Sequence, residues 1–150
     1  VYFGPRQLLT RDDWHKAISA AYGNALLFGC SSGGQISGRD VGDDSVNAVA
    51  IKFERTTIRA ASAAIANADA SRQCARSIAE QLAAPDLAGV IVLSDGLNVN
   101  GSELAAGFGE ALGRNVPVCG GLAGDGANFA QTCVGLGGPP KPGVIAAIGL

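Results

Sequence analysis

Glycine-rich polar segments follow three apolar stretches of this chain and restrict the folds open to it. The segments are Gly29–Gly34, Ser94–Gly101 and Cys119–Gly126. Each one begins where an apolar run ends, as at the carboxyl end of a buried strand. Glycine accounts for 22 of the 150 residues, about twice its usual share of roughly 7%. This pattern predicts strands followed by sharp turns whose backbone comes close to other groups.

Predicted strands and helices alternate at the start of the chain. Val1–Gly4 is predicted to be a short buried strand, and Thr10–Tyr22 a helix. Thr10 is a natural N-cap, and Gly23 suits the left-handed position that ends many helices. Ala25–Gly29 is apolar without alternation, which is typical of a strand covered on both faces. The chain is therefore expected to begin with a β-α-β unit.

Two further helices are predicted in the middle of the chain. The first covers residues 69–83, where apolar residues recur at helical spacing before Pro85. The second is Gly101–Leu112, with Asn100 and Glu103 forming an asparagine version of the capping box. Strands are predicted around these helices at Ser45–Phe53, which alternates, at Arg55–Ala60 beside it, at Leu87–Ser94 and at Val116–Cys119.

The end of the chain predicts two more strands, Phe129–Leu136 and Val144–Leu150. The glycine- and proline-rich turn between them predicts a hairpin. Together the elements indicate one α/β domain over residues 1–150, with helices packed against a mixed β-sheet. Because the chain has no methionine and starts within an apolar run, we expect it to be a fragment of a longer protein.

Charge, cysteine content and hydrophobicity bear on the partners and the cellular compartment of the protein. The 11 basic and 13 acidic residues are interspersed, so no basic patch is available to follow a nucleic-acid backbone. The four cysteines are widely spaced and form no Cys-x-x-Cys pair, which favours a reducing compartment. No apolar run reaches about 18 residues, so no membrane span is expected. We predict a cytoplasmic protein.

The three glycine-rich segments are predicted to form one ligand site. The carboxyl ends of parallel strands share one edge of a sheet, so the loops would meet there. Glycine lets the backbone approach a ligand, while N–H groups and Ser or Asp side chains supply directed hydrogen bonds. Small polar molecules suit such a lining. For each loop alone, the alternative is that glycine only permits a tight turn.

Nucleophilic catalysis is an alternative that the sequence supports less well. Gly29–Gly33 matches the Gly-x-Ser-x-Gly pattern of hydrolases, with Ser31 as nucleophile, but no histidine follows it. Cys30 could instead work with His15, although His15 is expected to be solvated on its helix. We therefore predict a binding domain rather than an enzyme.

Metal and nucleotide sites are not supported. A single histidine and scattered cysteines do not supply a zinc ligand set. No phosphate-binding loop or dinucleotide fingerprint occurs, so no cofactor is predicted. The acidic residues Asp40, Asp43 and Asp44 suit a solvated turn before a strand rather than an acid/base pair.

Taken in order, the loop motifs resemble those of the FIST N domain. The matching stretches are Phe28–Ile36, Leu93–Leu97 with Asn100–Leu104, and Pro117–Gly126, followed by Thr132–Val134. FIST domains are sensory modules of bacterial signal-transduction proteins that also occur in some F-box proteins. This chain has Ser32 and Gln35 where the family commonly has threonine and glutamate.

The resemblance implies a sensor that binds a small ligand such as an amino acid and signals to a neighbouring domain or protein. An interaction module for another protein is a further alternative. The candidate ligand-binding residues are Cys30, Ser31, Ser32, Gly33, Asp95, Gly96, Gly120, Gly121 and Asp125. In the leading hypothesis, N–H groups at Gly33, Gly96 and Gly121 bind a carboxylate, and Asp95 or Asp125 binds an amine.

Overall fold

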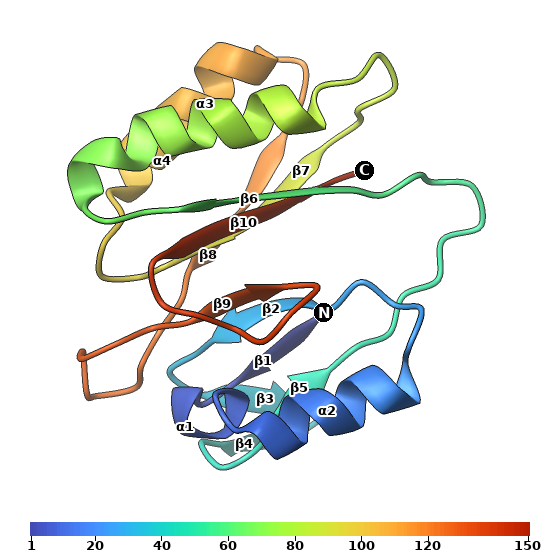
Figure 1. Ribbon diagram of the computed structural model, residues 1–150, viewed down its shortest axis with the longest axis vertical. Coiled ribbons are helices and arrows are strands. Elements are labelled where there is room, and N and C mark those ends of the chain that lie inside the picture. The colour runs from blue at the N-terminus through green and yellow to red at the C-terminus, as the bar shows by residue number, and fades with distance from the viewer.

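Two four-stranded sheets face each other in the computed structural model, which describes residues 1–150 (Figure 1). The first sheet has the order β5-β1-β2-β9. Its strands β1 and β2 are parallel, whereas β5 and β9 run antiparallel to their neighbours. The bounds of these strands are Tyr2–Gly4 (β1), Phe28–Ser31 (β2), Asn47–Ala48 (β5) and Val134–Leu136 (β9).

The second sheet has the order β6-β10-β7-β8. Its strands β7 and β8 are parallel, and β10 is antiparallel to both of its neighbours. A separate small hairpin joins β3 to β4. The bounds are Arg59–Ala64 (β6), Val90–Ser94 (β7), Val118–Leu122 (β8), Val144–Gly149 (β10), Gln35–Ser37 (β3) and Asp40–Gly42 (β4).

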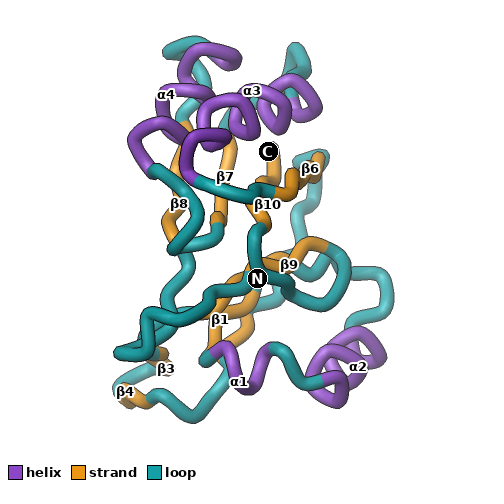
Figure 2. Tube along the Cα trace, turned by 60° about the vertical axis from the view of Figure 1, so that its left-hand side comes forward, coloured by secondary structure: helices purple, strands orange, loops and turns teal.

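Helices cover the outer face of each sheet, so the domain has four layers (Figure 2). The helices are Arg6–Leu9 (α1), Asp12–Ala21 (α2), Ser71–Leu82 (α3) and Gly101–Leu112 (α4), with a 3-10 turn at Ala68–Ala70 (η1). β10 shows how one strand serves two layers. Its side chains at Ile145 and Ala147 pack under α3 and α4, whereas Ala146 and Ile148 face β2 and β9. This alternation follows from the period of two in a strand.

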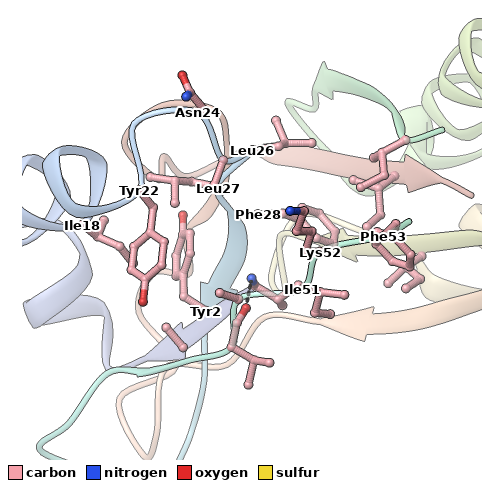
Figure 3. A pocket seen from close by; sticks show the side chains of 18 of the residues that line it. Tyr2, Ile18, Tyr22, Asn24, Leu26, Leu27, Phe28, Ile51, Lys52 and Phe53 are labelled. Atoms are coloured by element: carbon pink, nitrogen blue, oxygen red, sulfur yellow. Dashed lines mark hydrogen bonds between the residues drawn. The ribbon is translucent and has the colours of Figure 1, made fainter. Parts of the chain in front are cut away.

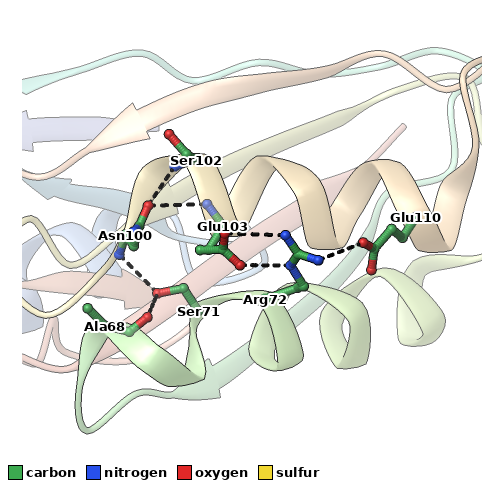
Figure 4. Close-up of polar contacts among 7 residues, drawn as sticks. All are labelled: Ala68, Ser71, Arg72, Asn100, Ser102, Glu103 and Glu110. Carbon is green, nitrogen blue, oxygen red and sulfur yellow. Dashed lines mark hydrogen bonds and ion pairs between the residues drawn. The ribbon is translucent and has the colours of Figure 1, made fainter.

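Polar contacts join α3 to α4 on the outside of the domain (Figure 4). The Arg72 guanidinium donates to both carboxylate oxygens of Glu103, at 2.7 and 3.2 Å, and to Glu110 at 3.1 Å. The Asn100 side chain accepts from the N–H groups of Ser102 and Glu103, as an N-cap should. The return bond of a capping box is absent, because the Asn100 N–H donates to Ser71 Oγ instead.

The predicted fold class is confirmed, as are the β-α-β start and the bounds of α4. The first helix differs from its prediction. Thr10 is not an N-cap but the C-cap of α1, and its hydroxyl donates to the carbonyl of Arg6, the first residue of that helix. Arg11 occupies the N-cap of α2 and makes no side-chain capping bond. Gly23 is outside the left-handed region.

Three strand predictions were wrong. Of Ser45–Phe53 only β5 forms a strand, and the predicted pairing of Arg55–Ala60 beside it is absent because β6 pairs with β10. The terminal hairpin is also absent. β9 pairs with β2 in one sheet and β10 with β6 and β7 in the other. The turn between β9 and β10 therefore carries the chain from one sheet to the other.

None of the helices has the length and apolar character that crossing a bilayer requires.

Candidate functional site

The three predicted loops come from both sheets and meet at Ala123 and Gly124. The Ala123 N–H donates to the Ser94 carbonyl at the end of β7, over 2.8 Å. The next residue, Gly124, donates to the Ser31 carbonyl at the end of β2, over 2.9 Å. The loop after β8 thus lies between the loops after β2 and β7. The strand ends converge, but across the two facing sheets rather than along one sheet.

All three loops also bind one stretch of the chain, the Ala130–Cys133 segment. The Asp125 carboxylate accepts from the N–H groups of Ala130 and Gln131, at 3.2 and 3.1 Å. The Gly96 N–H donates to Thr132 Oγ1 at 2.9 Å. Ser31 Oγ accepts from the Cys133 N–H at 3.0 Å. Many of the polar groups predicted to hold a ligand therefore hold this segment.

Asp95 is buried and its carboxylate organises the loop after β7. Its Oδ1 accepts from the N–H groups of Leu97 and Asn98 at 2.9 and 2.8 Å and from the Asn98 amide at 3.2 Å. Its Oδ2 accepts from the N–H of Gly143, the residue that precedes β10, at 3.0 Å. Burial opposes ionisation most strongly, but these N–H bonds outweigh it and lower the pKa of Asp95 below its ordinary value.

Asp125 is buried at the other end of this network. Besides Ala130 and Gln131, its carboxylate accepts from Arg6 Nε at 3.2 Å. Burial again opposes ionisation, and the N–H bonds together with Arg6 lower the pKa of Asp125. The Arg6 side chain is 24% exposed and Asp125 only 2%, so this ion pair joins a buried carboxylate to a solvent-facing guanidinium.

Two of the predicted glycines, Gly96 and Gly120, are packed against the backbone of the chain itself. A Cβ on Gly96 would overlap the Ala123 carbonyl oxygen, and one on Gly120 would overlap the Val92 carbonyl oxygen. Gly120 also has a φ of 153°. Gly121 of β8 pairs with Leu93 of β7, and a Cβ there would meet nothing within 4 Å; Gly121 and Gly120 both line a hollow beside α4. Close approach to backbone explains the first two glycines.

Cys30 and Ser31 lie inside the domain. Cys30 packs between the two sheets, and burial, followed by the nearby Cys133, raises its pKa to about 12. Ser31 is fully buried. His15 is on α2 and is half-buried beside Trp14 rather than solvated. Nothing around Cys30 favours the thiolate that a nucleophile requires.

Thiol alkylation should therefore avoid Cys30. Cys119 is exposed and free, whereas Cys30 and Cys133 are buried. We expect iodoacetamide at about pH 8 to modify Cys119 first, and Cys30 only when the protein unfolds. Peptide mass mapping at increasing reaction times measures the order. Rapid labelling of Cys30 in the native protein, persisting as the pH is lowered toward about 6, would contradict this picture and favour the catalytic alternative.

A polar crevice lies next to the Asp125–Arg6 pair. Its volume is about 650 Å³, within the range of roughly 300–1,000 Å³ that is usual for small-molecule sites. Three predicted residues, Ser32, Gly33 and Asp125, line it, and the other six do not. The full lining is Pro5, Arg6, Gln7, Leu8, Ser32, Gly33, Gly34, Gln35, Asp43, Asp44, Asp125, Gly126, Ala127 and Asn128.

Several polar groups of this crevice have no partner in the chain. The Arg6 guanidinium makes one hydrogen bond, through Nε, and its two terminal nitrogens make none. Gln35 is 4% exposed. Its Nε2 donates to Ser32 Oγ at 2.9 Å, but its Oε1 is buried without a donor. The Gly33 and Gly34 N–H groups also donate to no other residue. Hydrogen-bond donors and an acceptor that have no partner in the chain therefore border the same crevice.

Arg6 was not predicted as a site residue, and Asp43 and Asp44 were predicted only to lie in a solvated turn. The two aspartates are exposed, as predicted, yet they also border the crevice. A usable signal existed for Arg6. It follows β1, and β1 is parallel to β2, so the rule that parallel strand ends share an edge also applies to Pro5 and Arg6. Short polar connections that follow parallel strands therefore meet at the same edge of the sheet, just as glycine-rich loops do.

Comparison with known families gives one match. The family model described as FIST N domain matches residues 1–150. No curated protein and no solved structure matches the chain.

Proposed function

The chain belongs to the FIST N domain family of signal-transduction sensory domains, and we propose that it senses an amino acid or a similar small zwitterion in the polar crevice. Ser32, Gly33 and Asp125 contribute to this site together with Arg6, Gln35, Asp43 and Asp44. Cys30, Ser31, Asp95, Gly96, Gly120 and Gly121 shape the loops around it. In this proposal, the domain works in the cytoplasm and passes ligand occupancy to a downstream signalling domain or protein.

The main support is that both signs of charge border one hollow. Asp125 fixes the Arg6 guanidinium through Nε and leaves its other nitrogens able to bind a carboxylate. Asp43 and Asp44 line the same crevice and form no ion pair with the chain. An ammonium group can bind to these carboxylates. Such a pair of opposite charges suits a zwitterion better than a simple anion or cation.

Neutral groups add direction to this arrangement. The Gly33 and Gly34 N–H groups can donate to the ligand carboxylate, and Gln35 Oε1 can accept from its ammonium. Gln35 takes the place of the glutamate that is common in the family, so here an amide oxygen supplies the acceptor. A buried polar atom without a partner destabilises a fold by roughly 1–3 kcal/mol, and a bound donor would remove that loss.

The Arg6–Asp125 pair connects the crevice to the rest of the domain. Asp125 binds the Ala130–Cys133 segment, which leads directly into β9. A ligand that changes the position of Arg6 therefore acts on a network that spans both sheets. We propose this route for passing occupancy from the crevice to the signalling partner.

A thermal-shift screen across the amino acids tests the proposal. A ligand at about 100 times its dissociation constant should stabilise the protein by roughly 2.7 kcal/mol. Arg6→Gln should reduce that gain to near zero, because the carboxylate contact is lost. Asp43→Asn combined with Asp44→Asn should reduce it for the same ligand by removing the ammonium contact.

Lys16→Gln is the matched control, because Lys16 forms only an exposed ion pair with Asp12 on α2. It should leave the ligand response unchanged. If no amino acid raises the melting temperature, or if Arg6→Gln and Lys16→Gln respond alike, the crevice does not bind a zwitterion.

A further inference from the structure

We infer that the chain has a second ligand site, an apolar groove that binds a small amphipathic carboxylate such as a medium-chain fatty acid. The groove lies where the Val49–Ile58 segment crosses from β5 in the first sheet to β6 in the second. It shares no residue with the polar crevice. The inference is therefore independent of the zwitterion proposal.

Side chains from three parts of the fold line the apolar groove (Figure 3). Tyr22 and Leu26–Phe28 form one wall, the crossing segment forms a second, and Ile91 and Ile148 of the second sheet complete it. The volume is about 460 Å³, and 17 of its 20 residues are hydrophobic. This size and character are typical of sites that enclose the apolar body of a small molecule.

The crossing segment leaves large apolar side chains in water. Val49 is 63% exposed, Ile51 58% and Phe53 37%. Contiguous apolar surface of this kind is uncommon on a monomer and marks interaction sites. The alternating pattern that predicted a strand here thus places apolar side chains on the groove.

Lys52 decides the charge of the ligand. It is the one charged side chain among the lining residues, and it forms no ion pair with the chain. Figure 3 shows it directed among the apolar side chains of the groove. A lysine can lay its methylene stem along an apolar wall while its ammonium binds an anion. No acidic side chain lines the groove, so a carboxylate is the complementary head group.

Tyr2 adds its aromatic ring to the apolar lining. The residue is 1% exposed, and its hydroxyl lies next to Gly135 of β9, which is not a lining residue of the groove. Lys52 is therefore the one charged contact that the side chains of the groove offer. An apolar body with a single anionic end fits one cation set in apolar walls, whereas a zwitterion would leave its ammonium without a carboxylate.

Calorimetric titration with sodium decanoate, kept below its micelle concentration, tests this site. We expect one decanoate to bind per chain, and decyltrimethylammonium to bind at least fivefold more weakly. Lys52→Gln should weaken decanoate binding by about fivefold to tenfold, because it removes one charge pair. Ile51→Asp should abolish binding by placing a like charge on the wall.

Two control variants separate binding in the groove from binding elsewhere on the protein. Val41→Asp changes a side chain that is 78% exposed and outside the groove, so decanoate binding should be unchanged. Arg6→Gln should also leave it unchanged, although it removes the zwitterion response. The inference is overturned if decanoate does not bind, if it binds no better than decyltrimethylammonium, or if Lys52→Gln has no effect. It is also overturned if Ile51→Asp changes only self-association, because the groove would then be a contact between copies.

Discussion

Replacement of Asp95 by asparagine should lower the free energy of unfolding by about 3 kcal/mol. Four N–H donors converge on the Asp95 carboxylate, three on Oδ1 and one, from Gly143, on Oδ2. The asparagine amide would keep one oxygen and place an NH₂ group against one of these donors. It would also remove the charge that strengthens the remaining bonds. Urea denaturation at neutral pH measures the loss.

The effect of Asp95→Asn should depend on pH with a defined sign. The folded pKa of Asp95 is lowered, relative to about 3.9 in an unfolded chain. Stabilisation by the ionised carboxylate is therefore complete above the unfolded pKa and is lost as the pH falls through the folded pKa. The difference between wild type and variant should stay constant from about pH 7 to about pH 5 and should narrow as the pH falls below about 4.

Asp86→Asn is the control for Asp95. Asp86 pairs with Arg59 at 2.8 Å, but its side chain is 66% exposed. Exposed ion pairs contribute about 0–1 kcal/mol, so this variant should resemble the wild type. Equal losses for Asp86→Asn and Asp95→Asn would show that Asp95 does not organise its loop.

Gly120→Ala should be the most damaging glycine substitution, with a loss of about 3 kcal/mol or more. The added Cβ would overlap the Val92 carbonyl oxygen on β7, and the φ of 153° strains any L side chain. Neither atom can move without breaking the pairing of β7 with β8. Thermal or urea unfolding of the variant measures the effect.

Gly109→Ala is the matched control for Gly120. Gly109 lies within α4, and a Cβ there meets nothing within 4 Å. Alanine favours the helix over glycine by roughly 0.5–1 kcal/mol, so this variant should be more stable than the wild type. A neutral Gly120→Ala would contradict the packing described for the end of β7 and β8.

The glycine-rich loops show how far sequence reasoning extends. Their convergence could be predicted, because apolar strands precede them and parallel strand ends share an edge. The groups that their residues contact could not be predicted. Gly96 and Gly120 face backbone carbonyls of the chain, and Asp95 binds Gly143, 48 residues away. A glycine needed to approach a ligand and one needed to approach another strand look the same in a sequence.

Local signals predicted helices well and sheet pairing poorly. The Asn100 side chain caps the start of α4 and the Gly113 backbone, at a φ of 73°, ends it, so its bounds could be predicted. The partner of β9 depends on β2, about 100 residues earlier, and no turn residue encodes that choice. The turn between β9 and β10 resembles a hairpin turn, yet it joins two sheets.

The polar crevice was only partly predictable for the same reason. Ser32 and Gly33 are in a motif, whereas Arg6, Asp43 and Asp44 are ordinary residues in short connections. They become a site because β1 ends beside β2 and because the β3–β4 hairpin leads into Asp43 and Asp44, which line the same crevice as Arg6. Such placement depends on contacts between distant segments.

Amide chemical-shift mapping tests the zwitterion site most directly. A ¹H–¹⁵N correlation spectrum of the protein is recorded with and without a mixture of the twenty amino acids at neutral pH. We expect the largest chemical-shift changes at the Gly33, Gly34 and Gly126 amides, with smaller ones through the Ala130–Cys133 segment. Unchanged amides around the crevice, or changes confined to Ile51–Phe53, would contradict this expectation.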